Sequence, residues 1–436
     1  MEWYISLSLG LIFLFVLFLT GAPIFVAFLI VVLIGISTII GTAGFPLLAN
    51  SLLETTTTGS LAAIPLFILM GELLFRSGTM EVLFSSIDTL VGKVKARQYV
   101  LVVALSAVFG ALSGAAMAVA AMLGRAVMPG MVKRGYDEKM SAGLILAGAS
   151  LAPIIPPSLL AIIVGTLADV SISKLLIAGI VPGILLIFIF LAYVFIRIRF
   201  NPNLAPKFVK SEYREVTPLN KVVACLRCTP FLLVIFSVMG LIMLGIATPS
   251  ESAATGVLGA LVTAGIYRKI SWAMILDSLK ASVSVTAVIL VIMAASKMFT
   301  ELLAFSGTSA ALVELVATLD LGWLAMLIVM MAVPFFLCMF IDTIAVMLLT
   351  IPIYQPIVHS LGFDAVWFWL LFLVNITLGA ITPPFGYTLF AFKAVVPDMP
   401  LGQIYRASWS FVTLFLLGMA LMIAFPSIVT TVPNLF

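Results

Sequence analysis

The sequence predicts an all-α polytopic membrane protein made of two inverted-topology repeats. Hydrophobic residues make up 63% of the 436 positions and charged residues 9%, a balance that suits a chain surrounded by lipid. Two diprolines, Pro156-Pro157 and Pro383-Pro384, lie inside apolar sequence at equivalent places in the two halves, 227 positions apart. The same spacing separates further matching residues: Pro129 and Pro356, Gly135 and Gly362, and Asp137 and Asp364. These matches indicate an internal repeat.

Each predicted repeat has three spans, a re-entrant helical hairpin, a broken helix and a final span. A transmembrane helix needs about 20 apolar residues. Runs near this length give the leading and final spans: 5–20, 24–41, 60–76 and 172–197 in the first half, and 229–247, 251–267, 282–303 and 406–430 in the second. The runs 140–168 and 364–393 contain the diprolines and are predicted to be broken helices. Backbone groups freed by proline must be buried in protein or line a hydrated cavity.

Two further apolar segments, 99–133 and 322–358, are too long for one span. Small or polar residues interrupt each near its centre, Ser113-Gly114 in the first and Asp342-Thr343 in the second. We therefore expect each segment to enter the membrane and return on the same side, as a re-entrant hairpin.

The basic residues place the two hairpins on opposite faces of the membrane, because short cytoplasmic loops are enriched in Lys and Arg. Both flanks of the first hairpin are basic, with Lys93, Lys95 and Arg97 before it and Lys133, Arg134 and Lys139 after it. Around the second hairpin, no Lys or Arg occurs between Met298 and Phe392. The ends of the first hairpin are predicted to be cytoplasmic and those of the second to be outside.

Residues 197–227 form a predicted cytoplasmic linker between the first repeat, 1–196, and the second, 228–436. The linker holds seven basic and two acidic residues. An odd number of spans on each side of it predicts that both termini are outside. The first apolar run has no basic region before it, so we expect it to remain a helix rather than to be cleaved as a signal peptide.

Two amphipathic stretches, 77–98 and 271–280, are predicted to occupy the same place in each half. In the first, apolar residues recur at helical spacing, which suits a helix lying in the plane of the membrane interface. Both stretches are either plain connectors or arms that join a mobile part to a static part.

The composition argues against several other classes of protein. The lysines and arginines are confined to a few loops, so the net charge of +4 does not indicate a nucleic-acid partner. Three cysteines and one histidine offer neither a disulfide framework nor a zinc site. No G-x-S-x-G, H-E-x-x-H or Walker sequence is present, so we expect neither a hydrolase nor an ATP-driven pump.

The hairpin tips and the helix breaks are the predicted ion sites. Broken helices expose carbonyl oxygens that bind sodium and helix N-termini that bind carboxylates. In each half the tip is expected to meet the break, and carbonyl, hydroxyl and carboxylate oxygens there suit a hard cation. The residues predicted for the first sodium site are Ser113, Gly114, Ala152, Ile155 and Pro157. Those predicted for the second are Phe340, Asp342, Thr343, Gly379 and Thr382.

Asp342 is the strongest single candidate, because an acidic group at mid-membrane depth is costly and indicates function by default. The alternative is that Asp342 caps the second arm of its hairpin. For Ser113, likewise, the alternative is that it only satisfies a helix end. Arg125 is expected to snorkel to the cytoplasmic interface rather than to bind substrate.

The remaining charged residues within spans have structural interpretations. Glu72 and Arg76 are four positions apart and are expected to pair on one helix face. Lys297 and Glu301 have the same spacing, so a pair is expected there too, with a substrate contact by Lys297 as the alternative. His359 is expected to be exposed in the loop after the second hairpin. Asp169 and Ser171 are expected to cap the span that follows them.

Several motifs in order resemble the large membrane subunit of tripartite ATP-independent periplasmic transporters. They lie at 63–72, 111–115, 154–158 and 178–183 in the first half and at 378–386 in the second. The resemblance covers nearly the whole chain. It departs at Ala152-Pro153, where family members often have a glycine, and this affects the backbone geometry of the first site.

The resemblance implies an elevator-type importer of organic acids, such as sialic acid or a C4-dicarboxylate, in the bacterial inner membrane. Sodium ions would be co-transported, and no organic cofactor is expected. The implied partners are a separate small membrane subunit and a periplasmic substrate-binding protein. The substrate carboxylate is expected between the two tips, near Ser158, Asp342 and Thr343 by position.

Other functions stay open at this point. A self-sufficient sodium and dicarboxylate symporter would keep the fold and dispense with the partners. An intramembrane enzyme would use Asp342 as its acid, but the facing break offers no second carboxylate. A passive channel agrees less well with paired hairpins of inverted flanking charge.

Overall fold

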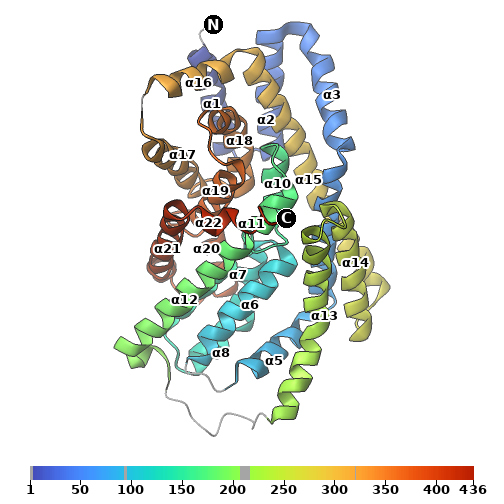
Figure 1. Cartoon of the computed structure of the whole chain (residues 1–436), viewed down its shortest axis with the longest axis vertical. Coiled ribbons are helices and arrows are strands. Elements are labelled where there is room, and N and C mark those ends of the chain that lie inside the picture. Colours follow the sequence, from blue (N-terminus) through green and yellow to red (C-terminus); the bar gives the residue numbers. More distant parts are fainter. Residues whose placement is uncertain (1–2, 93–95, 207–216, 320) are drawn as a thin grey trace.

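The computed structural model describes residues 3–92, 96–206, 217–319 and 321–436, and this part of the chain is helical without strands (Figure 1). The helices of the first half are α1 Trp3–Leu19, α2 Ile24–Gly35, α3 Gly44–Thr57, α4 Ala63–Arg76, α5 Met80–Val91, α6 Arg97–Ser113, α7 Ala116–Ala126, α8 Met128–Lys133, α9 Glu138–Ala149, α10 Leu159–Leu167, α11 Ile172–Ala178 and α12 Ile180–Phe200. Those of the second half are α13 Pro218–Met243, α14 Pro249–Ile266, α15 Trp272–Phe305, α16 Thr308–Thr318, α17 Trp323–Cys338, α18 Thr343–Ser360, α19 Ala365–Gly379, α20 Tyr387–Val395, α21 Leu401–Ala424 and α22 Ser427–Thr430. Short turns of π and 3-10 helix connect some of them: η1 Ile36–Ile40, η2 Gly41–Ala43, η3 Gly59–Ala62 and η4 Pro202–Leu204.

Seven helices of the described part are long and apolar enough to cross a membrane, which confirms a polytopic all-α membrane protein. Helices α6, α17 and α19 are apolar but shorter than a full span. They belong to the segments predicted as hairpins, which form α6–α8 and α17–α18, and to those predicted as broken helices, which form α9–α10 and α19–α20. Lys93, Lys95 and residues 207–216 of the predicted linker lie outside the described residues.

The two broken helices begin in the same way. Asp137 precedes α9, and its Oδ1 accepts a hydrogen bond of 2.8 Å from the Met140 N–H. Asp364 precedes α19, and its Oδ1 accepts a bond of 2.8 Å from the Trp367 N–H. A capping aspartate satisfies a helix N–H group that has no partner within the helix. The repeat spacing in the sequence therefore coincides with two equivalent helix starts.

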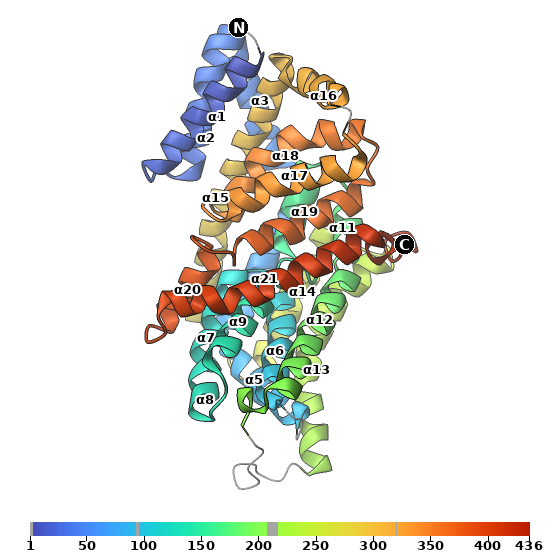
Figure 2. The ribbon, with the colours of Figure 1, turned by 90° about the vertical axis from the view of Figure 1, so that its left-hand side faces the viewer.

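The helices pack as two groups. The leading-helix group comprises α1–α4 and α13–α15, in which α4 packs on α14 and α15, and α15 also contacts α2 and α3. The hairpin group comprises α6–α12 and α17–α22, in which α6 and α7 pack on α9, and α17 and α18 pack on α19 (Figures 1 and 2). The two halves interlock in the hairpin group, because α10 packs on α18 and α20 packs on α7.

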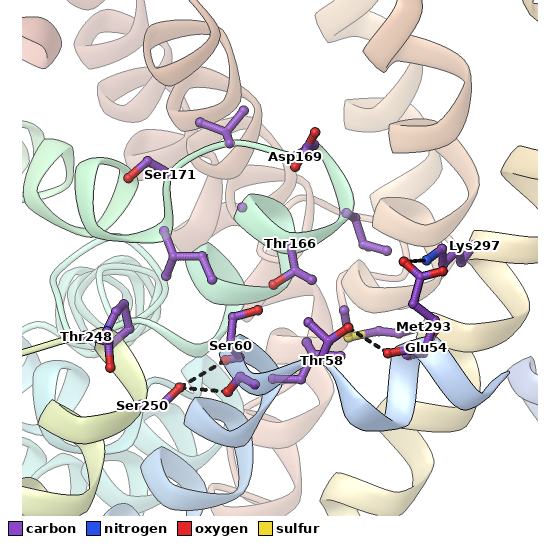
Figure 3. Close-up of a pocket in the computed structure, with 18 of the residues that line it drawn as sticks. Glu54, Thr58, Ser60, Thr166, Asp169, Ser171, Thr248, Ser250, Met293 and Lys297 are labelled. Atoms are coloured by element: carbon purple, nitrogen blue, oxygen red, sulfur yellow. Dashed lines mark hydrogen bonds and ion pairs between the residues drawn. The ribbon is translucent and has the colours of Figure 1, made fainter. Parts of the chain in front are cut away.

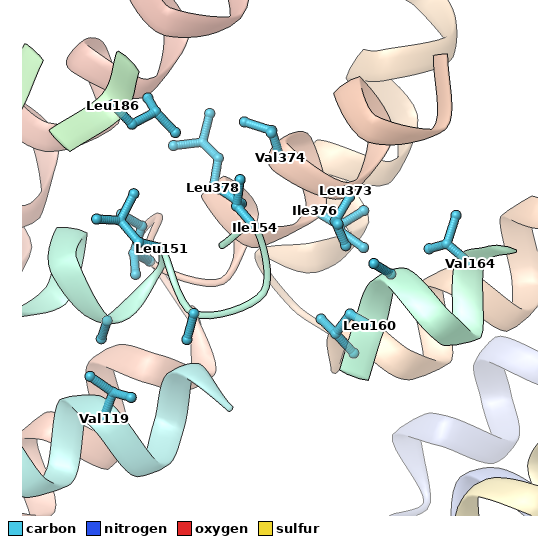
Figure 4. Close-up of a cluster of buried hydrophobic side chains, with 14 of the residues drawn as sticks. Val119, Leu151, Ile154, Leu160, Val164, Leu186, Leu373, Val374, Ile376 and Leu378 are labelled. Atoms are coloured by element: carbon cyan, nitrogen blue, oxygen red, sulfur yellow. The ribbon is translucent and has the colours of Figure 1, made fainter. Parts of the chain in front are cut away.

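Buried aliphatic side chains surround the first helix break (Figure 4). They come from the break itself, from the adjoining helices and from α19 of the other half: Val119, Leu151, Ile154, Leu160, Val164, Leu186, Leu373, Val374, Ile376 and Leu378. Close packing on every side holds the irregular backbone in one conformation and keeps it away from lipid.

One sequence-based boundary is wrong. Residues 271–280 are not a separate amphipathic element, because α15 runs without a break from Trp272 to Phe305. At the repeat spacing, residues 271–280 correspond to the first turns of α3 and not to residues 77–98. Residues 77–98 correspond instead to the region of α16. The polar C-terminal half of α3 concealed this helix in the sequence. The ends of the predicted linker are also helical, since α12 continues to Phe200 and α13 begins at Pro218.

Close approach of α9 and α21 joins the first broken helix to the last long helix of the chain. A methyl group on Gly143 of α9 would lie 2.5 Å from the Ala407 carbonyl oxygen and 2.7 Å from the Phe411 ring. Small residues allow such contacts between membrane helices, where van der Waals packing replaces the hydrophobic effect as the driving force.

We predict that Gly143→Ala lowers the free energy of unfolding by about 1–3 kcal/mol, because the methyl group forces α9 and α21 apart. Gly402→Ala is the matched control: it lies in α21, and its methyl group would meet no atom within 4 Å. Thermal unfolding of the purified protein in detergent measures both variants. Equal stability of the two variants would contradict the close packing.

Candidate functional site

The tip of the first hairpin is a left-handed turn between α6 and α7. α6 ends at Ser113, and Gly114 follows with a φ of 62°, which side chains other than glycine rarely adopt. The Ser113 hydroxyl accepts a hydrogen bond of 3.4 Å from the Ala115 N–H. A methyl group on Gly114 would lie 3.2 Å from the Leu159 nitrogen, so the tip contacts the start of α10.

The first break presents free carbonyl oxygens close to this tip. Within the described residues, no hydrogen bond reaches the carbonyl oxygens of Ile155, Pro156 or Pro157. A cavity of about 10 Å³, room for one water molecule, is lined by Ser113, Gly114 and Pro157 together with α4. Free carbonyl oxygens beside a space of this size are ligands suited to a hard cation.

Ala152 and Ile155, also predicted for the first site, face different neighbours. A methyl group on Gly110 would lie 2.8 Å from the Ala152 Cα, so Ala152 faces α6 near the tip. The Ile155 side chain packs toward α12 instead, where a methyl group on Gly183 would lie 2.7 Å from its Cγ1. Only the backbone of Ile155 is therefore available to the first site.

The second tip also lies against its own break. The ring of Phe340 at the tip is 5.8 Å from the ring of Phe385 after the diproline, and both side chains are exposed. Gly379, the last residue of α19, packs on α17, where a methyl group would lie 2.5 Å from the Cys338 Cβ. As in the first half, free oxygens remain: in the described part of the chain, the carbonyls of residues 339–341 accept no hydrogen bond.

The polar side chains predicted for the second site form local hydrogen bonds. Asp342 Oδ2 accepts a bond of 2.9 Å from the Ile344 N–H, so this residue caps α18. Thr382 is buried, and its hydroxyl donates a bond of 2.7 Å to the Leu378 carbonyl. The structure therefore agrees with the alternative in which Asp342 caps a helix.

Tyr387 is a residue of this region that the sequence analysis missed. The Thr343 hydroxyl donates a bond of 3.0 Å to the Tyr387 hydroxyl, which joins the start of α18 to the start of α20. Its position in the sequence was the signal that could have identified Tyr387, because it lies three residues after Pro384 and begins the second arm of the broken helix.

Ser158, the substrate candidate of the first half, is buried and caps α10. Its Oγ accepts a bond of 3.1 Å from the Ala161 N–H, and its hydroxyl donates to the Pro153 carbonyl. All three substrate candidates, Ser158, Asp342 and Thr343, therefore hold helix ends in place in this structure.

Of the two ion pairs predicted from i,i+4 spacing, the structure contains one and contradicts the other. Arg76 Nε and Glu72 Oε2 are 2.6 Å apart, which confirms the first pair. The second prediction is wrong, because Lys297 Nζ pairs with Glu54 Oε1 at 2.5 Å. Glu301 instead accepts a bond of 2.7 Å from the Ser51 hydroxyl. Packing of α3 along α15 places a partner beside Lys297 that sequence spacing could not reveal.

Other singled-out residues lie near helix ends. Arg125 is exposed in the last turn of α7, and its snorkelling stays a prediction. His359 is exposed but belongs to the last turn of α18 rather than to a loop. Ser171 caps α11 by accepting a bond of 3.3 Å from the Lys174 N–H, whereas Asp169 lies in the preceding turn with a φ of 53°.

A cavity of about 1100 Å³ lies between the two helix groups (Figure 3). One wall consists of α3, η3, α15 and the start of α14, and the other of the α10–α11 turn and α18. An adjoining cavity of about 730 Å³ shares Asp169, Thr300 and Gln355 with it. On the sequence-based topology, both cavities lie on the outer side.

Paired helix breaks in a polytopic helical membrane protein are typical of secondary transporters. The family model "Tripartite ATP-independent periplasmic transporter, DctM component" matches residues 11–428, and the chain belongs to this family. It is therefore a large permease of the tripartite type and not an enzyme.

Three relatives are similar along most of their length. The chain is 29% identical to the large permease UehC of the ectoine/5-hydroxyectoine transporter of Ruegeria pomeroyi, covering 95% of each protein. It is 30% identical to the large permease TeaC of the ectoine transporter of Halomonas elongata, covering 94% of this chain and 95% of TeaC. Identity to the C4-dicarboxylate large permease DctM of Pseudomonas aeruginosa is 29% over 89% of each chain.

Two solved structures share the fold. The YdaH transporter of Alcanivorax borkumensis superposes with a TM-score of 0.66 over 88% of this chain and 90% of YdaH, at 14% identity. MtrF of Neisseria gonorrhoeae superposes with a TM-score of 0.58 over 87% of this chain and 83% of MtrF, at 14% identity. At this identity the likeness concerns the fold alone.

We predict that Ser158→Ala lowers the free energy of unfolding by about 1–3 kcal/mol, because a buried cap is lost and the Pro153 carbonyl loses its donor. Ser171→Ala removes a cap that is exposed to solvent and should cost less, about 0.5–1 kcal/mol. Thermal unfolding in detergent compares the two variants. If Ser171→Ala lowers the free energy of unfolding more than Ser158→Ala does, the interpretation of Ser158 as a buried helix cap is wrong.

Proposed function

We propose that the chain is the large permease of a sodium-coupled secondary importer of an organic acid. The observation that carries the proposal is the meeting of a hairpin tip with a helix break in each half, where carbonyl oxygens accept no hydrogen bond among the described residues. Sodium binds to such oxygens, and a water-sized space lies between tip and break in the first half. The ions are cargo, and the proposal includes no organic cofactor.

Sodium is the proposed source of energy for uptake. Each sodium ion that moves inward down a potential of 100 mV contributes about 2.3 kcal/mol. Two ions, one at each site, would supply about 4.6 kcal/mol, which corresponds to a concentration ratio above a thousandfold for a substrate whose own movement carries no charge. The carboxylate of the substrate would lie between the tips, near the N-terminal ends of α10 and α18.

The transport movement is proposed to be a displacement of the hairpin group along the leading-helix group. Two features support it. The halves interlock through α10 on α18 and α20 on α7, so the hairpin group is suited to move as one body. The large cavity lies between this group and α3, the start of α14 and part of α15. Helices α5 and α16, which connect the groups at equivalent repeat positions, are the candidate arms.

The proposed setting is the bacterial inner membrane with both termini outside. The proposed partners are a small membrane subunit and a periplasmic substrate-binding protein, because the chain belongs to the tripartite family. The related permeases carry names that include ectoine and C4-dicarboxylate, so an organic acid of modest size is the substrate class proposed for this chain.

We predict that Thr382→Val raises the sodium concentration for half-maximal uptake about tenfold, because the substitution removes a hydroxyl from the second site. Thr377→Val is the control. Thr377 lies in α19, away from the break; like Thr382 it is buried and donates a 2.7 Å bond to the carbonyl four residues earlier. Uptake into proteoliposomes at varied sodium tests both. Identical sodium curves would remove Thr382 from the site.

A second prediction concerns the partners. Uptake of a candidate acid into proteoliposomes that hold this chain and its small subunit should require both a sodium gradient and the binding protein. Uptake that needs sodium but not the binding protein would favour the self-sufficient symporter. Uptake indifferent to sodium would refute the proposed ion coupling.

A further inference from the structure

The charge of the large cavity differs from what an importer of dicarboxylates needs. Of the residues that the structure describes, four carboxylates line it, those of Glu54, Asp169, Glu251 and Glu301, against one ammonium, that of Lys297. A concave surface with this balance repels anions and raises the local concentration of cationic groups. Entry of a doubly negative substrate would be opposed by the wall of the cavity.

The Lys297 ammonium is held in an ion pair that is open to solvent. Lys297 Nζ lies 2.5 Å from Glu54 Oε1, and the two side chains are 34% and 67% exposed (Figure 3). An ion pair that is open to solvent contributes little net stability, so its separation costs little. Both charged groups are therefore accessible to a molecule inside the cavity.

The other three carboxylates differ in their availability. Glu251 accepts bonds of 2.8 Å from the backbone N–H and the hydroxyl of Thr248, and Glu301 accepts the bond from Ser51. Asp169 is exposed and has neither an ion pair nor a hydrogen bond to any described side chain. Asp169 is thus without a side-chain partner among the described residues, and Glu54 is held only by its exposed pair with Lys297.

We propose that this cavity binds a substrate that carries a cationic group as well as a carboxylate. The carboxylate pairs with Lys297 and the cationic group with Glu54, so a zwitterion replaces the ion pair without leaving either charge unpaired. A dicarboxylate pairs only one of its charges with Lys297, and its other carboxylate is repelled by Glu54 and Asp169. The chemical class is that of amino acids and of betaine-like solutes.

The cavity adjoins the hairpin group, which is the part proposed to carry the substrate. The Ser296 hydroxyl, next to Lys297 in α15, donates a bond of 2.9 Å to the Leu348 carbonyl of α18. The turn of α15 that carries Lys297 therefore contacts the second hairpin, and Gln355 of α18 lines the same cavity as Lys297. This inference rests on the proposed transport function and specifies its substrate class.

The test measures ligand binding to the membrane complex of this chain and its small subunit, without the binding protein, so that the selectivity of the binding protein does not enter. The probes are 4-aminobutanoate, a zwitterion, and pentanedioate, a dianion. Their binding is followed by the shift in thermal unfolding. We expect 4-aminobutanoate to bind more tightly than pentanedioate.

Variants of the ion pair give the sharper result. Glu54→Gln should weaken 4-aminobutanoate binding about fivefold and strengthen pentanedioate binding, because it removes a negative charge. Lys297→Gln should weaken both probes. Glu72→Gln, which disrupts a second exposed ion pair at the end of α4, is the matched control and should change neither. A variant that merely misfolds cannot weaken one probe and strengthen the other.

Tighter binding of pentanedioate, absence of binding by both probes, or an equal effect of Glu54→Gln on both would overturn the inference. Sodium-dependent uptake in the presence of the binding protein is measured on the same preparation. Uptake that persists alongside any of these results leaves the proposed function standing with a different substrate class. Loss of sodium dependence would count against the proposed function itself.

Discussion

The constraint on which the structure depends is that backbone polar groups in a membrane must find partners within the protein. Each diproline interrupts a helix at a place where lipid offers no replacement hydrogen bond. The chain meets this constraint at the first break by burying it inside the hairpin group, against the hairpin tip of the same half and against α19 of the other half, whereas Pro384 and Phe385 of the second break are exposed. Among the described residues, carbonyl groups that accept no hydrogen bond remain at the first break and at the second tip, which are the proposed places for a cation.

The same side chains support the fold and form the candidate site. Ser158 and Asp342 cap α10 and α18, and Thr343 ties α18 to α20 through Tyr387. Binding of an ion beside these residues would therefore act on helix ends directly. Ion binding at a site would thus affect the position of a hairpin, because the cap, the break and the tip contact one another.

Charged side chains, rather than close packing, are the main feature of the space between the helix groups. In the described part of the chain, the large cavity is lined by four carboxylates and one ammonium, and the exposed pair of Lys297 and Glu54 lies on its leading-helix wall. The breaks offer neutral carbonyl dipoles, whereas the cavity offers full charges. A substrate would thus encounter charge selection before it reaches the proposed ion sites.

The sequence by itself determined the membrane class and the helix interruptions at the diprolines, because apolar length and proline are local signals. It also determined the Glu72–Arg76 pair, since both partners lie on one helix. Only the tertiary structure decided the partner of Lys297, because Glu54 comes from α3, a helix whose polar end concealed it. The same holds for Tyr387 and for the cavity between the groups, because contacts between distant segments leave no mark in spacing or composition.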